Sequence, residues 1–177
     1  MAMTTQIDLY TGAGPTVAAT TAVKWNRVDT EAGTTVIPTP TATGTNFSYV
    51  KTFRIEITAT GSLTMTDILF GKVASESTTG TKLWHVAGTH AVGAYVQAVA
   101  APTATGDNNV TGPTVNGAVA TAVPLTSAPP AAYDAGPYNT TGIKGNLIEV
   151  ALGVDATNTT AGSAVATPTL RWQWTES

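Results

Sequence analysis

The sequence predicts an all-β protein: a single β-sandwich of jelly-roll or immunoglobulin-like type with about seven to nine strands. Two observations lead to this prediction. Val and Thr, which favour strands, and Gly and Pro, which favour turns, recur along the whole chain of 177 residues. No long window has the apolar spacing and the end caps of an amphipathic helix.

The clearest pair of strands lies in residues 49–73, YVKTFRIEITATGSLTMTDILFGKV. From Phe53 onward, apolar and polar residues alternate with the period of two that marks a strand. Gly61 and Ser62 supply a turn, and the alternation that follows shifts at Asp67, which indicates a bulge or a strand covered on both faces. The segment therefore predicts either a hairpin or an arch that passes from one sheet to the other.

Further strands are expected where short runs are rich in β-branched and aromatic residues. These runs are residues 22–28, 81–86, 91–99, 117–123, 145–154 and 169–176. In the last run Leu170, Trp172 and Trp174 share one face, and Trp25 also falls on an apolar strand face. We expect these three tryptophans to pack in the core.

The length fits one domain, which we place at residues 21–177. Residues 1–20 are small and polar and are punctuated by Gly and Pro, which predicts an N-terminal arm. Residues 100–145 have almost no charge and many Pro, Gly and Asn, and so long a loop is unusual inside a compact domain. Apart from one short strand, we expect this excursion to lie across a neighbouring molecule, with a disordered linker as the alternative.

Charged residues make up only 11% of the chain, where about a quarter is ordinary, and the mean hydropathy is +0.10. Such a surface is either softened by small side chains or covered by partner chains, and we expect a homo-oligomer. The net charge of −3 comes from acids and bases spread singly. Direct nucleic-acid binding, which needs a basic stripe, is not expected.

The chain has no cysteine, so it forms neither disulfides nor a thiolate site. The N-terminal residues lack the basic region and apolar core of a secretory signal, and no run is long and apolar enough to cross a membrane. We therefore expect a protein that is made in the cytosol and has no membrane partner.

No catalytic, cofactor or metal residues are expected, and we predict that the protein is not an enzyme. His85 and His90 would fall on opposite faces of a continuous strand, which disfavours a shared metal ion. Glu56 and Glu149 could form a glycosidase pair only if folding brought them together, and solvent-facing acids are the simpler interpretation. The serines lack the motif of a nucleophile elbow.

Three other patterns have simple structural explanations. Residues 11–15, TGAGP, lack the strand and helix that flank a phosphate-binding loop. Residues 106–112, GDNNVTG, resemble an Asx-rich turn more than a calcium loop. Chance accounts for the glycosylation-type triplets in so Thr-rich a chain; they begin at Asn46, Asn109, Asn139 and Asn158.

Four aromatic residues lie outside the apolar strand faces and are the candidates for contact with a partner: Tyr10, Trp84, Tyr133 and Tyr138. Exposed aromatic rings of this kind also serve carbohydrate-binding β-sandwich modules, which makes such a module the alternative function of another class. Exposure of Trp84 and of the tyrosines on a flat face would favour that alternative.

Residues 49–73 and the terminal TLRWQWTES, residues 169–177, resemble the strand–turn–strand and the closing strand of immunoglobulin-like or jelly-roll domains on tailed-bacteriophage capsids and tails. The resemblance implies a structural role in the virion, best fitted by a head decoration (cement) protein that binds the major capsid protein, often as a trimer. Such proteins are made in the host cytoplasm without an export signal and leave by lysis. A tail tube or fibre-associated protein is the alternative within the same class.

Overall fold

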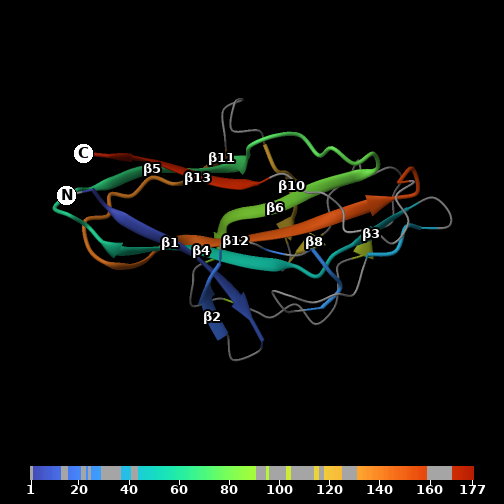
Figure 1. The fold of residues 1–177 in the computed structure, drawn as a ribbon, viewed down its shortest axis with the longest axis horizontal. Helices are drawn as coiled ribbons and strands as arrows, with labels where there is room; N and C mark the ends of the chain where they lie inside the picture. Colours follow the sequence, from blue (N-terminus) through green and yellow to red (C-terminus); the bar gives the residue numbers. More distant parts are fainter. Residues whose placement is uncertain are drawn as a thin grey trace.

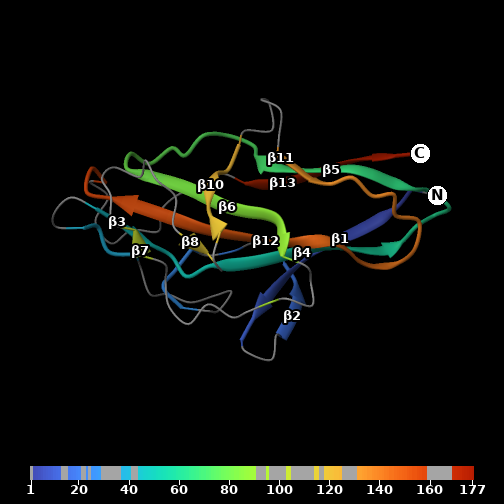
Figure 2. The same cartoon turned by 180° about the vertical axis from the view of Figure 1, so that it is seen from behind.

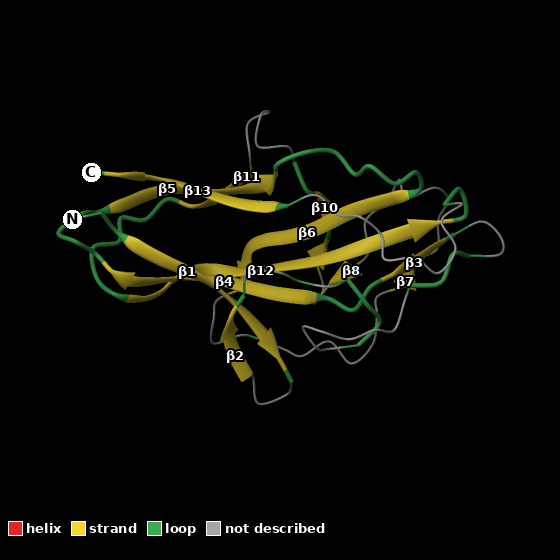
Figure 3. Cartoon of the chain, viewed as in Figure 1, coloured by secondary structure: helices red, strands yellow, loops and turns green. Residues whose placement is uncertain are grey.

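Strands from distant parts of the chain form two sheets that lie one over the other, an antiparallel β-sandwich (Figure 1). This computed structural model describes residues 2–12, 16–20, 23, 25–28, 37–40, 44–90, 95, 103–104, 114–115, 118–124, 131–158 and 169–177. Within these residues every element is a strand and none is a helix (Figure 3). The predicted fold class is confirmed, while the choice between jelly-roll and immunoglobulin-like type stays a prediction.

The large sheet has the order β10-β6-β12-β4-β1-β2, and the small sheet has the order β11-β5-β13. The large sheet comprises β1 (Thr4–Thr11), β2 (Thr16–Ala19), β4 (Lys51–Ala59), β6 (Thr81–His90), β10 (Thr121–Ala122) and β12 (Gly142–Asp155), with β3 (Thr45–Phe47) on β12 and β7 (Thr103–Ala104) on β3. The small sheet comprises β5 (Met65–Lys72), β11 (Ala131–Asp134) and β13 (Leu170–Glu176). A separate pair joins β8 (Thr114–Val115) to β9 (Ala118–Val119). Figure 2 shows the same two layers from behind.

Strands β4 and β5 form an arch between the sheets, which decides the alternative that the sequence left open. Their turn is closed by the Leu63 amide, which donates to the Thr60 carbonyl at 2.9 Å. Gly61 and Ser62 both have positive φ, at 58° and 72°. Asp67, with φ of 51°, lies where the pairing of β13 with β5 shifts register, so the expected bulge is present.

The main core lies between the two sheets and follows the alternation visible in the sequence. Phe53, Ile55 and Ile57 of β4 point into it and are at most 2% exposed. Alternate residues of β12 and the apolar residues of β5 meet them; they are Ile148, Val150, Leu152, Val154, Met65, Ile68 and Phe70. Burial of these side chains, at about 25 cal/mol per Å² of apolar surface, is the main force that holds the sheets together.

A second apolar cluster covers the opposite face of the large sheet. Trp84 and Val86 of β6 pack there with Phe47, Val115 and other side chains, all buried. Because Val115 belongs to residues 100–145, this part of the excursion folds back onto its own sheet. Contact of the excursion with a neighbouring molecule stays a prediction, and two short strands, β9 and β10, are present where one was expected at 117–123.

The predicted N-terminal arm is also corrected, because Thr4–Thr11 form strand β1 and pair with β4. Asp8 lies opposite Arg54 in the register, and the two side chains form a buried ion pair at 2.9 Å. Residues 25–28, expected as a strand, are irregular. Of the strand expected at 91–99, only Tyr95 lies within the described residues.

Glu76 ties the end of β5 to the start of β6. Its carboxylate accepts hydrogen bonds from Lys72 Nζ at 2.6 and 2.7 Å and from the Leu83 amide at 2.7 Å. Burial raises the pKa of this carboxyl, but the hydrogen bonds outweigh burial, and the pKa lies below its ordinary value of 4.5. The ionised form therefore stabilises the fold.

We predict that Glu76→Gln lowers the free energy of unfolding by about 1–2 kcal/mol at neutral pH, because Lys72 loses its charged partner. Since the pKa is depressed on folding, this contribution is present above pH 4.5 and is lost as the pH falls through the folded value. Urea unfolding from pH 7 to pH 3 should show the variant and the wild type converging. The exposed Glu176→Gln is the control, and an equal loss there would contradict the assignment.

Gly80 occupies a turn that no larger residue fits. Its φ is +73°, and a Cβ would lie 2.5 Å from the Asn158 amide nitrogen and 2.6 Å from Asp155 Oδ1. Gly142 is the matched control, because its φ is +103° but no atom lies within 4 Å of a Cβ.

We predict that Gly142→Ala costs about 1 kcal/mol of stability, from the strain of positive φ alone. Gly80→Ala should cost roughly 1–3 kcal/mol more, because the loop around Asp155 must also move. Thermal unfolding of both variants measures the difference, and equal losses would show that the contacts around Gly80 do not matter.

Candidate interaction surface

A cleft of about 760 Å³ opens along one side of the sandwich, between β1 of the large sheet and β13 of the small sheet. Its lining is mainly apolar and includes three of the four tryptophans; the residues are Thr5, Gln6, Ile7, Ala19, Thr20, Val23, Trp25, Phe53, Thr169, Leu170, Arg171, Trp172 and Trp174. We refer to it as the β1–β13 cleft.

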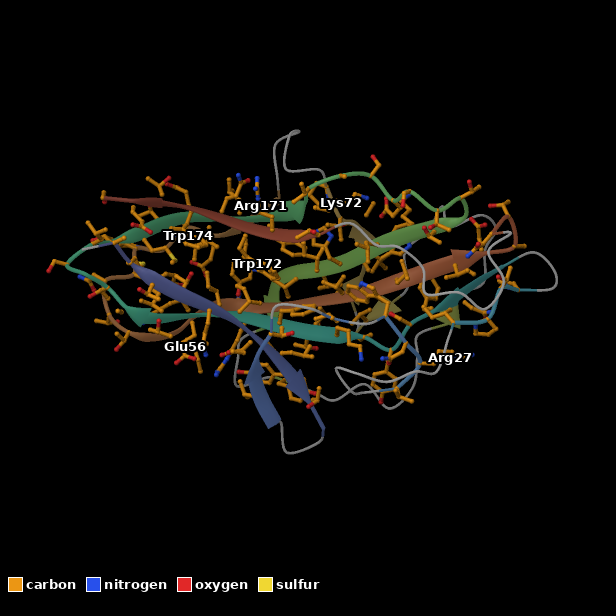
Figure 4. The ribbon with its side chains drawn as sticks, viewed as in Figure 1. Arg27, Glu56, Lys72, Arg171, Trp172 and Trp174 are labelled. Atoms are coloured by element: carbon orange, nitrogen blue, oxygen red, sulfur yellow. The ribbon has the colours of Figure 1, made fainter. Side chains whose placement is uncertain are left out.

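Strand β13 positions the indole rings by simple alternation. Trp172 and Trp174 lie on the side of the strand that faces β1, whereas Arg171 lies on the opposite side (Figure 4). The Trp172 ring packs against Phe53 at a centroid distance of 5.9 Å and against Phe70 at 4.9 Å. Trp174 is less enclosed by rings, and its Nε1 donates to Glu176 Oε1 at 2.9 Å.

The indole N–H of Trp172 has no acceptor in the described structure, although it is buried from solvent. An unsatisfied buried donor costs about 1–3 kcal/mol of folding free energy. The folded state would therefore be more stable if this N–H had an acceptor. Trp25, Trp172 and Trp174 pack against the main core, as expected, but they are only partly buried and also line the cleft.

The backbone of β13 has one free edge, because within the described residues this strand pairs only with β5. The Thr169 carbonyl accepts from the Val73 amide at 2.9 Å, and Ser177 exchanges two hydrogen bonds with Thr64. Hydrogen bonding alternates along an antiparallel strand, so the peptide groups of Leu170, Trp172 and Trp174 point away from β5. The strand thus presents backbone donors and acceptors beside the apolar cleft.

The charges around the cleft favour a neutral occupant. Among the described lining residues Arg171 is the one that carries a charge, and that side chain is exposed on the outer face of the small sheet. Among the described residues that line the cleft there is no carboxylate or imidazole. These lining residues offer apolar contact and backbone hydrogen bonds.

Three of the four aromatic residues proposed for partner contact are buried, which corrects their expected exposure. Tyr10 is 4%, Trp84 is 3% and Tyr133 is 6% exposed. Trp84 belongs to the second apolar cluster, and burial raises the pKa of the Tyr133 phenol. Tyr138 is half-buried, and its hydroxyl donates to Asp134 Oδ1 at 2.9 Å.

The other candidate sites do not assemble among the described residues. His85 is buried, its Nδ1 lies 3.0 Å from the Thr121 carbonyl, and burial lowers the pKa of its imidazole. The side chain of His90 lies outside the described residues. No group of residues suited to hold a metal ion occurs within the described ranges.

Glu56 and Glu149 lie on neighbouring strands, but four residues apart in register, because Glu149 pairs with Thr52. They are therefore not directly opposed across the two strands. Glu149 is buried at 2% exposure, which corrects its expected exposure to solvent. Residues 106–112 and part of 11–15 lie outside the described residues.

No protein-family model, curated protein or solved structure matches this chain. In the part of the chain that the structure describes, no helix is long and apolar enough to span a membrane.

We predict different costs for removing the two indoles of β13. Trp172→Ala should lower the free energy of unfolding by about 2–4 kcal/mol, because the ring contacts with Phe53 and Phe70 are lost. Trp174→Ala should cost about 1 kcal/mol or less, since its ring is less enclosed. Urea unfolding followed by circular dichroism measures both, and a larger loss for Trp174 would contradict the packing described.

Proposed function

We propose that this protein is a non-enzymatic structural component of a tailed-bacteriophage particle, specifically a capsid decoration (cement) protein. One observation carries the interaction role: the neutral, tryptophan-rich β1–β13 cleft beside a free strand edge, on a sandwich with few charges. The virion setting rests on the resemblance of residues 49–73 and 169–177 to capsid and tail domains.

In this proposal the sandwich is the rigid body and its open side makes the contacts. Tight burial of β4, β5 and β12 gives a stiff unit that transmits force without deforming. Because Thr4–Thr11 belong to the large sheet, they contribute one wall of the cleft instead of a clasping arm. The partners are further copies of the chain and the major capsid protein, and their contacts would stiffen the shell.

The test is binding of the purified protein to empty expanded capsids from the same phage, measured by co-sedimentation. We expect saturable binding with a fixed number of copies per capsid, and weaker binding for Trp174→Ala, which removes apolar surface from the cleft. Asn139→Ala, at an exposed position away from the cleft, is the control. No binding, together with absence of the protein from purified particles, would overturn the proposal.

Electron microscopy of antibody-labelled particles separates the head position from the tail position. Label distributed over the head supports a decoration protein. Label confined to the tail would replace it with the tail tube or fibre-associated alternative.

A carbohydrate-binding module is the second candidate, favoured by the grouping of Trp25, Trp172 and Trp174 with the polar Thr5 and Gln6 in one cleft. Indole rings stack on the apolar faces of other rings, while neutral polar groups fix orientation. Titration with soluble glycans, followed by tryptophan fluorescence, tests this function. A saturable shift that is lost in Trp174→Ala would support it.

A further inference from the structure

We propose that β13 is the edge through which two copies of this chain associate, by antiparallel pairing of β13 with β13 of the second copy about a two-fold axis. The inference rests on the proposed interaction role and names the surface and the occupant. Two three-stranded sheets would become one continuous sheet. A free strand edge commonly recruits another strand in this way.

The backbone chemistry of the edge calls for a strand as its partner. The peptide groups of Leu170, Trp172 and Trp174 point away from β5 and present donors and acceptors at regular spacing. The register shift beside Asp67 places the bulge on β5, so β13 itself stays regular. A regular edge can pair over its whole length.

The side chains select an antiparallel register centred on Gln173. The outward-pointing peptides must form the hydrogen-bonded pairs. Of the registers that satisfy this condition, the one that opposes the most indoles places Trp172 opposite Trp174 of the second copy and Gln173 opposite its own counterpart. Aromatic pairs across strands stabilise the pairing, and this register forms two of them. The indoles that are half-buried in one copy would gain cover from the other.

The charges of the strand favour the same orientation. Arg171 lies near its start and Glu176 at its end, and they are the two charged residues of β13. In this antiparallel register Arg171 lies opposite Thr175 and Glu176 lies opposite Leu170 of the second copy, so no like charges are opposed, whereas in-register parallel pairing would align like charges. The charges are therefore compatible with antiparallel pairing and disfavour the parallel one.

Pairing over so short an edge gives a modest interface. Because one strand from each copy makes the contact, we expect a dissociation constant in roughly the micromolar range. The pairing has two-fold symmetry and joins two copies, in contrast to the trimer that the phage resemblance implies.

The test uses charge swaps at Gln173, whose side chain lies on the outer face of the small sheet. We expect light scattering coupled to size exclusion to show the mass of two copies for the wild type, decreasing toward one on dilution. Gln173→Lys and Gln173→Glu should each weaken association at least tenfold, because like charges meet across the axis. An equal mixture of the two variants should restore the mass of two copies.

Asn139→Lys is the control for added charge and should associate as the wild type does, since residue 139 is exposed and follows Tyr138, which bridges to β5 on the edge opposite to β13. A monomer at every concentration, a trimer, or a dimer that both Gln173 variants leave intact would overturn the inference. None of these results bears on capsid binding, which is measured on particles, so the two proposals fail separately.

Because the chain has no cysteine, Gln173→Cys gives an independent measurement. Directly opposed residues of a non-hydrogen-bonded pair have Cα atoms about 4.5 Å apart, within the range of a disulfide. We expect rapid formation of a disulfide-linked dimer under mild oxidation, and only slow linkage for Asn139→Cys. Equal rates for the two variants would contradict the pairing.

Discussion

The long strand β12 is the constraint on which the rest of the structure depends. It pairs with β3 and β4 along one edge and with β6 along the other. From Leu147 to Asp155 every residue is buried, so both faces of the strand need apolar or hydrogen-bonded cover. The small sheet supplies that cover on one face, and the second apolar cluster supplies it on the other.

Continuity along β12 also explains the irregular join between β3 and β4. The Ser48 amide donates to the Leu152 carbonyl at 2.8 Å, and the Leu152 amide donates back to Ser48 Oγ at 2.9 Å. The hydroxyl of Ser48 in turn donates to the Tyr49 carbonyl. A side chain thus takes the place of a backbone acceptor, and the ladder passes through a shift of register without leaving a buried amide unsatisfied.

The two sheets are joined along one side of the sandwich and stay apart along the other. Short strands and Glu76 bridge the side near β6 and β10, whereas β1 and β13 do not pair with each other. The Trp172 and Trp174 rings fill part of that opening. The same asymmetry therefore produces the cleft and the free edge, which are the features that both proposals use.

The sequence by itself determined the fold class, the arch or hairpin at residues 49–73, the break in alternation at Asp67 and the closing strand. Each follows from local alternation and turn chemistry, which act between near neighbours. Tertiary structure alone decided that the arch joins two sheets, that Thr4–Thr11 enter the large sheet, and that Trp84 and Tyr133 are buried while Trp172 lines a cleft. Burial depends on which distant segment covers a face, and a period of two along one strand does not carry that information.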